Sequence, residues 1–235
     1  MTREIIVTDL TRFTNGNIVC TAGVDSATGM CIRPMPYLPT SECVRLNILP
    51  GAKLTGNFTL SQECSGPHQE DHNYDKLTFH GPSTSDEFKM ALRASLFSSV
   101  SEGFEVDLPP GQKCLPPKHI GPRSIITVSV APRHIQIIDD AYKAGKIKLN
   151  FTDNSGQEFR FLPITDLGFH NYASDAKRKT SLDTVNSLIH TQKEVYVRIG
   201  LSRVYTAPNG VEGYWLQANG IYTFPEFNEQ IRSYR

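Results

Sequence analysis

A stretch rich in proline and glycine divides this chain into two parts of similar length. Between Asp107 and Arg123 it contains five prolines and two glycines. Proline has a fixed φ and no backbone N–H, so such a stretch forms neither a helix nor a central strand. The 235 residues are therefore predicted to form an N-terminal domain over 1–106, a linker over 107–123 and a C-terminal domain over 124–235.

Short β-strands dominate the first part. Runs of apolar and β-branched residues bounded by turn residues predict strands at 4–8, 18–24, 30–33, 52–60 and 76–80. The turn 25–29 joins two of them in a hairpin. Thr84 and Glu87 have the spacing of a capping box, and Phe88 and Leu92 follow at helical spacing. We expect one small barrel that is closed by one amphipathic helix.

The second part has the strand order of a known small barrel. Strands are predicted at 124–138, 146–152, 158–162, 195–201 and 214–224. Ser181 can cap a helix between the third and fourth strands, with Val185 and Ile189 directed inward. A five-stranded barrel with its helix at this point is the oligonucleotide/oligosaccharide-binding (OB) arrangement. The expected fold class is mainly β with a few helices, built as two small OB-like β-barrels in tandem.

Several motifs also resemble a known family. They are Ile5–Leu10, Arg123–Thr127, Asp166–Phe169, Gly200–Arg203 and Trp215–Pro225. With these motifs, nearly the whole chain resembles a family of prokaryotic proteins described as containing a dual OB domain. The resemblance implies a fold, and it implies no activity and no catalytic residues.

The outward face of the second barrel is the main candidate site. Alternation predicts an inward set made of Ile147, Leu149, Phe151, Phe159 and Phe161. The residues expected to bind are Lys146, Lys148 and Arg160 on the opposite face, Tyr142, Lys143, Tyr205 and Tyr214 in or beside loops, and Arg198. Cations that follow phosphates and rings that stack on bases suit single-stranded nucleic acid. A sheet with one solvated face shows the same alternation without any ligand.

The fourth and fifth strands leave a second interpretation open. Tyr196 and Arg198 share one face of the fourth strand, and Trp215, Gln217 and Asn219 share one of the fifth. These side chains either extend the platform or pack against the first barrel. The alternative function is a protein-interaction adaptor that uses the barrel surfaces and these aromatic strands. Basic and acidic residues number 24 each, so any contact with nucleic acid must be local.

Residues with catalytic or metal-binding chemistry form no complete motif. Cys64, His68, Asp71 and His72 lie close together, but their spacing matches no standard zinc site, and ordinary loop polarity explains them better. Cys114 and His119 share the predicted linker, where neither side chain would be held in place for nucleophilic catalysis. We therefore expect a non-catalytic binding module without a cofactor.

The cysteines and the apolar segments indicate the expected compartment. The five cysteines include no Cys-x-x-Cys pair and are expected to be free thiols in a reducing cytoplasm. No stretch has the apolar length of a signal peptide or a membrane span. The expected partners are single-stranded nucleic acid or another protein, and not a membrane.

Overall fold

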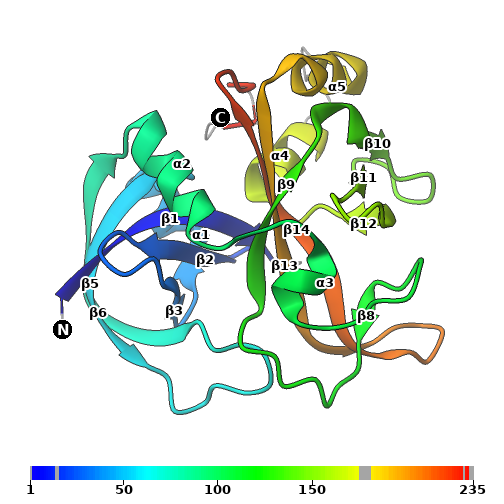
Figure 1. Cartoon of the computed structure of the whole chain (residues 1–235). Helices are drawn as coiled ribbons and strands as arrows, with labels where there is room; N and C mark the ends of the chain where they lie inside the picture. Colours follow the sequence, from blue (N-terminus) through cyan, green and yellow to red (C-terminus); the bar gives the residue numbers. More distant parts are fainter. Residues whose placement is uncertain (1, 14–15, 175–180, 230, 233–235) are drawn as a thin grey trace.

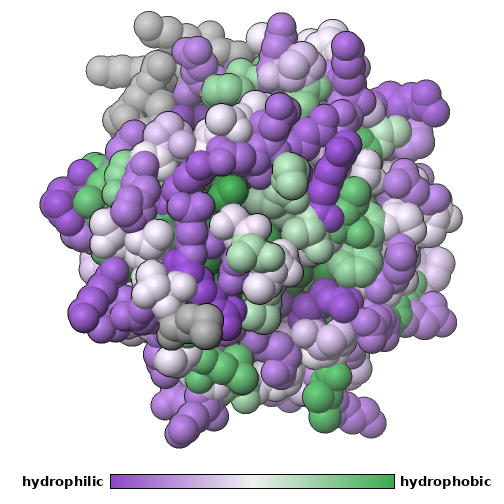
Figure 2. Space-filling view, turned by 60° about the vertical axis from the view of Figure 1, so that its left-hand side comes forward, coloured by the Kyte–Doolittle hydropathy of each residue, from purple (hydrophilic) through white to green (hydrophobic). Residues whose placement is uncertain are grey.

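Two β-rich halves lie side by side in the computed structural model (Figure 1), which describes residues 2–13, 16–174, 181–229 and 231–232. The prediction of a mainly β chain is confirmed. In the described ranges the helices are α1 (Thr40–Arg45), α2 (Ser85–Arg93), α3 (Val100–Phe104), α4 (Leu167–Ser174) and α5 (Leu182–Thr191). No helix in this part of the chain is long and apolar enough to cross a membrane. Hydrophilic residues predominate on the face in Figure 2, around a smaller hydrophobic area.

The first half forms a closed five-stranded barrel. Its strands are β1 (Thr2–Arg12), β2 (Ile18–Asp25), β3 (Cys31–Met35), β5 (Ala52–Leu60) and β6 (Asp71–Pro82). They follow the order β1-β5-β6-β3-β2, and pairing of β1 with β2 closes the ring. All these pairs are antiparallel except β3 with β6. The predicted barrel is confirmed, and α1 and the short β4 (Leu38–Pro39) lie between its third and fourth strands.

Helix α2 begins with the predicted capping box. The Thr84 hydroxyl accepts a hydrogen bond from the Glu87 backbone N–H at 3.2 Å, and the Glu87 carboxylate accepts one from the Thr84 N–H at 2.7 Å. These bonds satisfy backbone donors that the first turn leaves unpaired. Phe88 packs against Ile6 of the first barrel and also against Tyr222 of the second half. The helix therefore packs against both halves.

Two open sheets form the second half. Its longer strands are β9 (Ile125–Val130), β10 (Ile135–Asp139), β11 (Ile147–Thr152), β12 (Glu158–Pro163), β13 (Glu194–Thr206) and β14 (Glu212–Phe224). One sheet has the order β10-β11-β12, and the other has the order β7-β9-β13-β14-β8, with β7 (Leu96–Phe97) and β8 (Cys114–Leu115) at its edges. Among the described residues, these sheets do not close into the second barrel that we expected. A 3₁₀ turn at Pro132–His134 interrupts the first strand, and β12 meets β14 only through an isolated bridge from Ile164 to Ala218.

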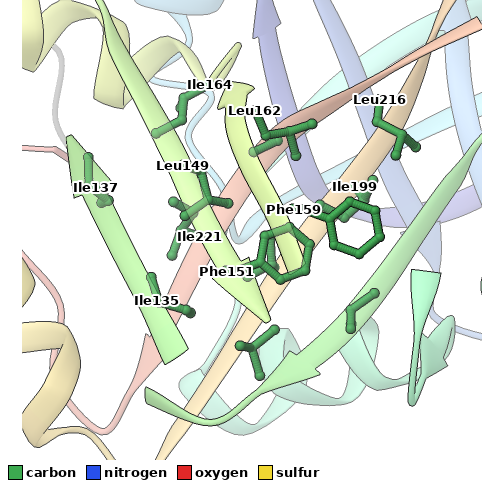
Figure 3. Close-up of a cluster of buried hydrophobic side chains, with 14 of the residues drawn as sticks. Ile135, Ile137, Leu149, Phe151, Phe159, Leu162, Ile164, Ile199, Leu216 and Ile221 are labelled. Atoms are coloured by element: carbon green, nitrogen blue, oxygen red, sulfur yellow. The ribbon is translucent and has the colours of Figure 1, made fainter. Parts of the chain in front are cut away.

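The core of the second half lies between these two sheets (Figure 3). Four of the five residues predicted to point inward are buried there. Phe161 is the exception, because it is 57% exposed. Leu149 pairs with Leu162 and Phe151 pairs with Phe159, so Asn150 faces two residues of β12. This β-bulge inserts one residue and breaks the alternation, which turns both Arg160 and Phe161 outward.

Part of the proline-rich stretch, which we expected to be a solvated linker, packs on the second half. Leu108 and Leu115 are buried in the core of the second half. Strand β8 pairs with β14 at the edge of the sheet, where short strands tolerate nearby prolines because few ladder hydrogen bonds are needed. The preceding elements α3 and β7 pack on this second core as well.

A fully buried ion pair joins the two halves. Arg198 on β13 is 0% exposed, and its Nη2 donates to Oδ2 of Asp9 on β1 at 2.7 Å. Its Nη1 donates to the hydroxyls of Ser95 and Thr127 at 2.8 and 2.9 Å. Tyr196 on the same strand is buried against α2. For Tyr196 and Arg198, packing against the first half is the interpretation that the structure shows, whereas Trp215 donates its indole N–H to the Tyr205 carbonyl within the second half.

A second polar cluster lies at the same junction. Glu70 of the first half accepts hydrogen bonds from the backbone N–H groups of Ser124 and Ile125 at 2.7 and 3.2 Å. The next residue, Asp71, accepts from Arg33 Nε at 2.6 Å and from Arg203 Nη2 at 2.7 Å. Burial alone would raise the pKa of Asp71, but these two guanidinium groups hold it below its ordinary value. Charged side chains of one half thus satisfy polar groups of the other.

Candidate functional site: a basic cleft and a polar groove

A small basic cleft lies where the first barrel meets the second half. Four basic side chains line it: Arg12 at the end of β1, Lys146 immediately before β11, Lys148 on β11, and His170 on α4. Its volume is about 170 Å³, and residues 163–165 after β12 form another wall. We call this hollow the basic cleft. Lys146 and Lys148 were expected to lie together on a ligand face, and the structure places both here.

Backbone pairing between the halves places Arg12 in the cleft. The Arg12 N–H donates to the Thr165 carbonyl at 3.0 Å, and Thr11 forms an isolated bridge with Asp166. Asp166 also accepts a hydrogen bond from the Phe169 N–H at 3.0 Å, at the start of α4. The end of β1 and the first turn of α4 are therefore held together. This arrangement brings Arg12 and His170, which are far apart in the sequence, to one hollow.

Positive charge in the basic cleft is only partly balanced. Lys148 lies 3.5 Å from the Asp140 carboxylate. In the described part of the chain, no carboxylate forms an ion pair with Arg12 or Lys146. Burial lowers the pKa of His170, and the nearby charges of Arg12 and Lys146 lower it further. A hollow with this excess of positive charge favours an anion.

A larger polar groove follows on the same face of the sheet. It has a volume of about 710 Å³ and lies between β10–β12 and α5. Its walls include Arg133, His134, Gln136, Asn150, Arg160, Phe161, Asn186 and His190. We call this hollow the polar groove. Lys148 and Asn150 lie two residues apart on β11, so they share a face and the cleft and the groove follow one another along this strand.

Phe161 has an unusual conformation beside the polar groove. Its φ is +57°, a left-handed value that costs a bulky residue roughly 1–2 kcal/mol. The Asn150 side-chain oxygen accepts a hydrogen bond from the Phe161 N–H at 2.8 Å and so supports this conformation. Strain of this kind is often found at functional sites. The result is an exposed aromatic ring on a face that is otherwise polar.

Lys113 adds a further cation between the cleft and the groove. Its Nζ donates to the Arg160 carbonyl at 2.8 Å. Burial lowers the pKa of Lys113, and the charge of Lys148 lowers it further, so these two lysines lie near each other. Arg160 itself pairs with Glu158 at 2.7 Å. We call Arg12, Lys146, Lys148, Lys113 and Arg160 the basic track.

The remaining residues of the predicted site lie elsewhere. Tyr142 is 95% exposed in the β10–β11 loop, with the exposed Lys143 beside it, and Tyr205 is 56% exposed on β13. Tyr214 is 6% exposed and packs against His68, with the ring centroids 5.5 Å apart, so it offers no ring to a ligand. Arg198 is completely buried at the junction, because it neutralises Asp9, and it was wrongly expected on the ligand face.

The four candidate metal ligands each contact other protein groups. Asp71 binds two arginines, and His72 Nδ1 lies 2.8 Å from the Glu70 carbonyl. The Cys64 thiol lies 3.5 Å from the Asp71 carbonyl, and His68 Nε2 lies 3.4 Å from the Leu201 carbonyl. Among the described residues, no three His, Cys, Asp or Glu side chains are grouped so as to hold a metal ion.

Cys114 and His119 show no sign of an activated nucleophile. Cys114 is buried, and its thiol lies 3.6 Å from the Leu115 carbonyl. Burial raises the pKa of Cys114, which disfavours the reactive thiolate. All five cysteines are free thiols in the structure, in agreement with the expected absence of disulfides.

Sequence reasoning missed three contributors to this surface. Lys113 lies in the proline-rich stretch, which the sequence predicts to be a linker, and simple alternation predicts that Phe161 points into the core. Arg12 stands at the end of a predicted strand, and no local pattern marks it as part of a site.

No family model, curated protein or solved structure that was compared with the chain matches it.

Proposed function

We propose that this protein binds single-stranded nucleic acid along the basic track and the polar groove. The observation that carries the proposal is that neighbouring outward positions of β11 line both hollows, with Lys148 in the basic cleft and Asn150 in the polar groove. Cations of the track are suited to follow a phosphate backbone, and the exposed Phe161 ring is suited to stack on a base. Amide side chains such as Asn150 add hydrogen-bonding groups without charge. The excess positive charge is local, so it is compatible with zero net charge.

We further propose that both halves are OB-folds, the second one partly open. In the first half, three antiparallel strands are followed by a parallel pairing of the third strand with the fifth, which is the OB strand order. The second half repeats this order if β9 and β10 count as one bent strand and the Ile164–Ala218 bridge as the parallel pairing. OB-folds commonly bind ligands on the face of their second and third strands. In the second half these strands are β11 and β12.

The adaptor alternative keeps part of the surface that it assumes. Tyr196 is 2% exposed and packs against α2 inside the molecule, whereas Trp215 is half-buried and Tyr205 is 56% exposed. The proposal of nucleic-acid binding accounts in addition for the exposed Phe161 ring and for the cations of the basic track.

The test is binding of labelled single-stranded DNA and RNA of mixed sequence, measured by fluorescence anisotropy at several salt concentrations. The variant Arg12→Gln/Lys146→Gln/Lys148→Gln is expected to bind on the order of tenfold more weakly or worse. Its salt dependence, as the slope of log K against log[salt], should be smaller by about 2, since each contact with a single strand contributes roughly 0.7.

The matched control removes the same number of positive charges at positions outside the two hollows. Arg45, Lys118 and Lys193 are exposed and lie outside the two hollows. Their replacement by glutamine should leave both the affinity and the salt slope close to those of the unaltered protein. Equal losses in the two triple variants would show that binding depends on overall charge alone and would refute the proposed site.

Phe161 provides an independent prediction. The Phe161→Leu variant keeps apolar bulk and backbone strain but removes the ring, so affinity should fall by about 1–3 kcal/mol while stability stays unchanged. The Phe161→Gly variant should lose the same affinity, yet its free energy of unfolding should stay within roughly 1 kcal/mol of the original, since relief of the left-handed strain offsets the entropy cost of glycine. Anisotropy and urea unfolding measure the two quantities. Full affinity in the leucine variant would exclude stacking.

A further inference from the structure

The basic cleft has a neighbour of different chemistry. A second hollow of about 360 Å³ shares Arg12 and His170 with the cleft as lining residues. Its other walls are Phe13, Gly16, Thr40, Val44, Leu167 and Asn171. We call it the side hollow. Because Arg12 and His170 line both hollows, we call the two hollows compartments.

The two compartments suit different parts of one ligand. The cleft contributes the charges of Arg12, Lys146 and Lys148, whereas the residues that line only the side hollow are uncharged in the described part of the chain. In the side hollow, the Phe13 ring packs against Tyr37 with the centroids 4.7 Å apart, which holds the ring in place. A fixed aromatic ring with apolar neighbours and one amide side chain is typical of a pocket for a flat heterocycle.

We propose that these compartments bind a nucleoside monophosphate, either free or as the phosphorylated end of a strand. The phosphate lies among Arg12, Lys146 and His170, and the base lies in the side hollow against Phe13. This inference rests on the proposed function, since the basic cleft is part of the basic track. It goes further because it distinguishes a strand with a terminal phosphate from one without it.

The charge of the ligand explains the preference. A terminal phosphomonoester carries about −1.5 to −2 charges at neutral pH, and an internal phosphodiester carries only one. Arg12 and Lys146 have no carboxylate partner in the described part of the chain. A more highly charged anion therefore interacts more favourably with these two cations. Lys148 is already close to Asp140 and contributes less. The additional negative charge of a strand end therefore adds affinity at this place.

The experiment compares one octanucleotide with a 5′-phosphate, with a 3′-phosphate and with hydroxyl ends, alongside AMP, adenosine and inorganic phosphate, by calorimetric titration of the full chain. We expect one phosphorylated end to bind about tenfold more tightly than the hydroxyl form, and AMP to bind more tightly than adenosine or phosphate. The better of the two phosphorylated forms identifies the strand end. Tight binding of AMP together with no preference between the strands would assign the site to free nucleotide.

Variants separate the two compartments. Arg12→Gln should abolish the preference for a terminal phosphate, and Arg12→Lys should retain part of it. Phe13→Leu should weaken AMP binding but leave the binding of inorganic phosphate unchanged. Phe161→Leu lies in the polar groove and should weaken the octanucleotide without affecting AMP.

Two outcomes distinguish this inference from the proposed function. If all three octanucleotides bind equally and AMP does not bind, the two-compartment site is refuted and the proposed function stands. If AMP binds and depends on Phe13 and Arg12 while no octanucleotide binds, the strand-binding function is refuted and the nucleotide site stands.

Discussion

Replacement of Arg198 by methionine is expected to lower the free energy of unfolding by about 3–5 kcal/mol. The change leaves the Asp9 carboxylate, which is 1% exposed, without its cationic partner. It also leaves the hydroxyls of Ser95 and Thr127 without the donor that they now share. A buried charge without a partner is costly because desolvation is no longer offset. Urea unfolding followed by circular dichroism measures the loss.

Two further variants separate the charge effect from lost packing. Asp9→Leu/Arg198→Met removes both charges and should lose less stability than Arg198→Met alone. Arg160→Met removes an exposed arginine that pairs with Glu158, and its effect should stay below about 1 kcal/mol. If the double variant is less stable than the single one, the buried carboxylate is not the source of the loss.

The second large effect that we expect on the free energy of unfolding comes from pH. Acidification should destabilise the protein because His68 is buried in its uncharged form. His68 is 1% exposed, and burial lowers its pKa to about 4, with a further contribution from Arg33 and Arg203. Its pKa in the unfolded chain is about 6.5. Between these values the unfolded chain binds the proton and the folded protein does not, so stability falls as the pH falls from about 6.5 to 4. The slope from this one group is about 1.4 kcal/mol per pH unit, and the total is on the order of 3 kcal/mol.

The His68→Phe variant tests this assignment. Its free energy of unfolding should change less between pH 6.5 and 4 than that of the original protein, while above pH 7 the difference between the two should stay constant. Urea unfolding at a series of pH values provides both curves. Asp71 contributes in the same direction at lower pH, because its pKa is depressed in the folded state. Parallel curves over the whole range would show that His68 is not the responsible group.

Much of the fold was predictable because most of its strands and two of its helices leave local patterns. The barrel strands of the first half overlap the predicted runs, although β6 begins at Asp71, five residues before the predicted start, and Thr84 and Ser181 mark the starts of their helices as predicted. The bulge at Arg160 and Phe161 leaves no such pattern, since the residues on either side alternate normally. The sequence predicts only a bend at Pro132, whereas the structure has a 3₁₀ turn at Pro132–His134 that separates β9 from β10.

Residues of the candidate site could be predicted from the sequence only where they belong to one strand or helix. Lys146 and Lys148 lie two residues apart on one strand, so alternation alone placed them on one face. Arg12 and His170 come from different halves and meet only after the chain has folded. The prediction for Arg198 was wrong for the same reason. Its partner Asp9 is 189 positions away in the sequence, and no local pattern indicates that the two residues pair.

The buried carboxylates at the junction also affect the order in which the molecule is completed during synthesis. Asp9, Glu70 and Asp71 emerge from the ribosome with the first barrel, whereas Ser124, Arg198 and Arg203 follow much later. Arg33 of the first half already pairs with Asp71 and lies 3.9 Å from Glu70, so Asp9 is the carboxylate that waits for its arginine. Translation must therefore reach β13 before the charge of Asp9 is paired.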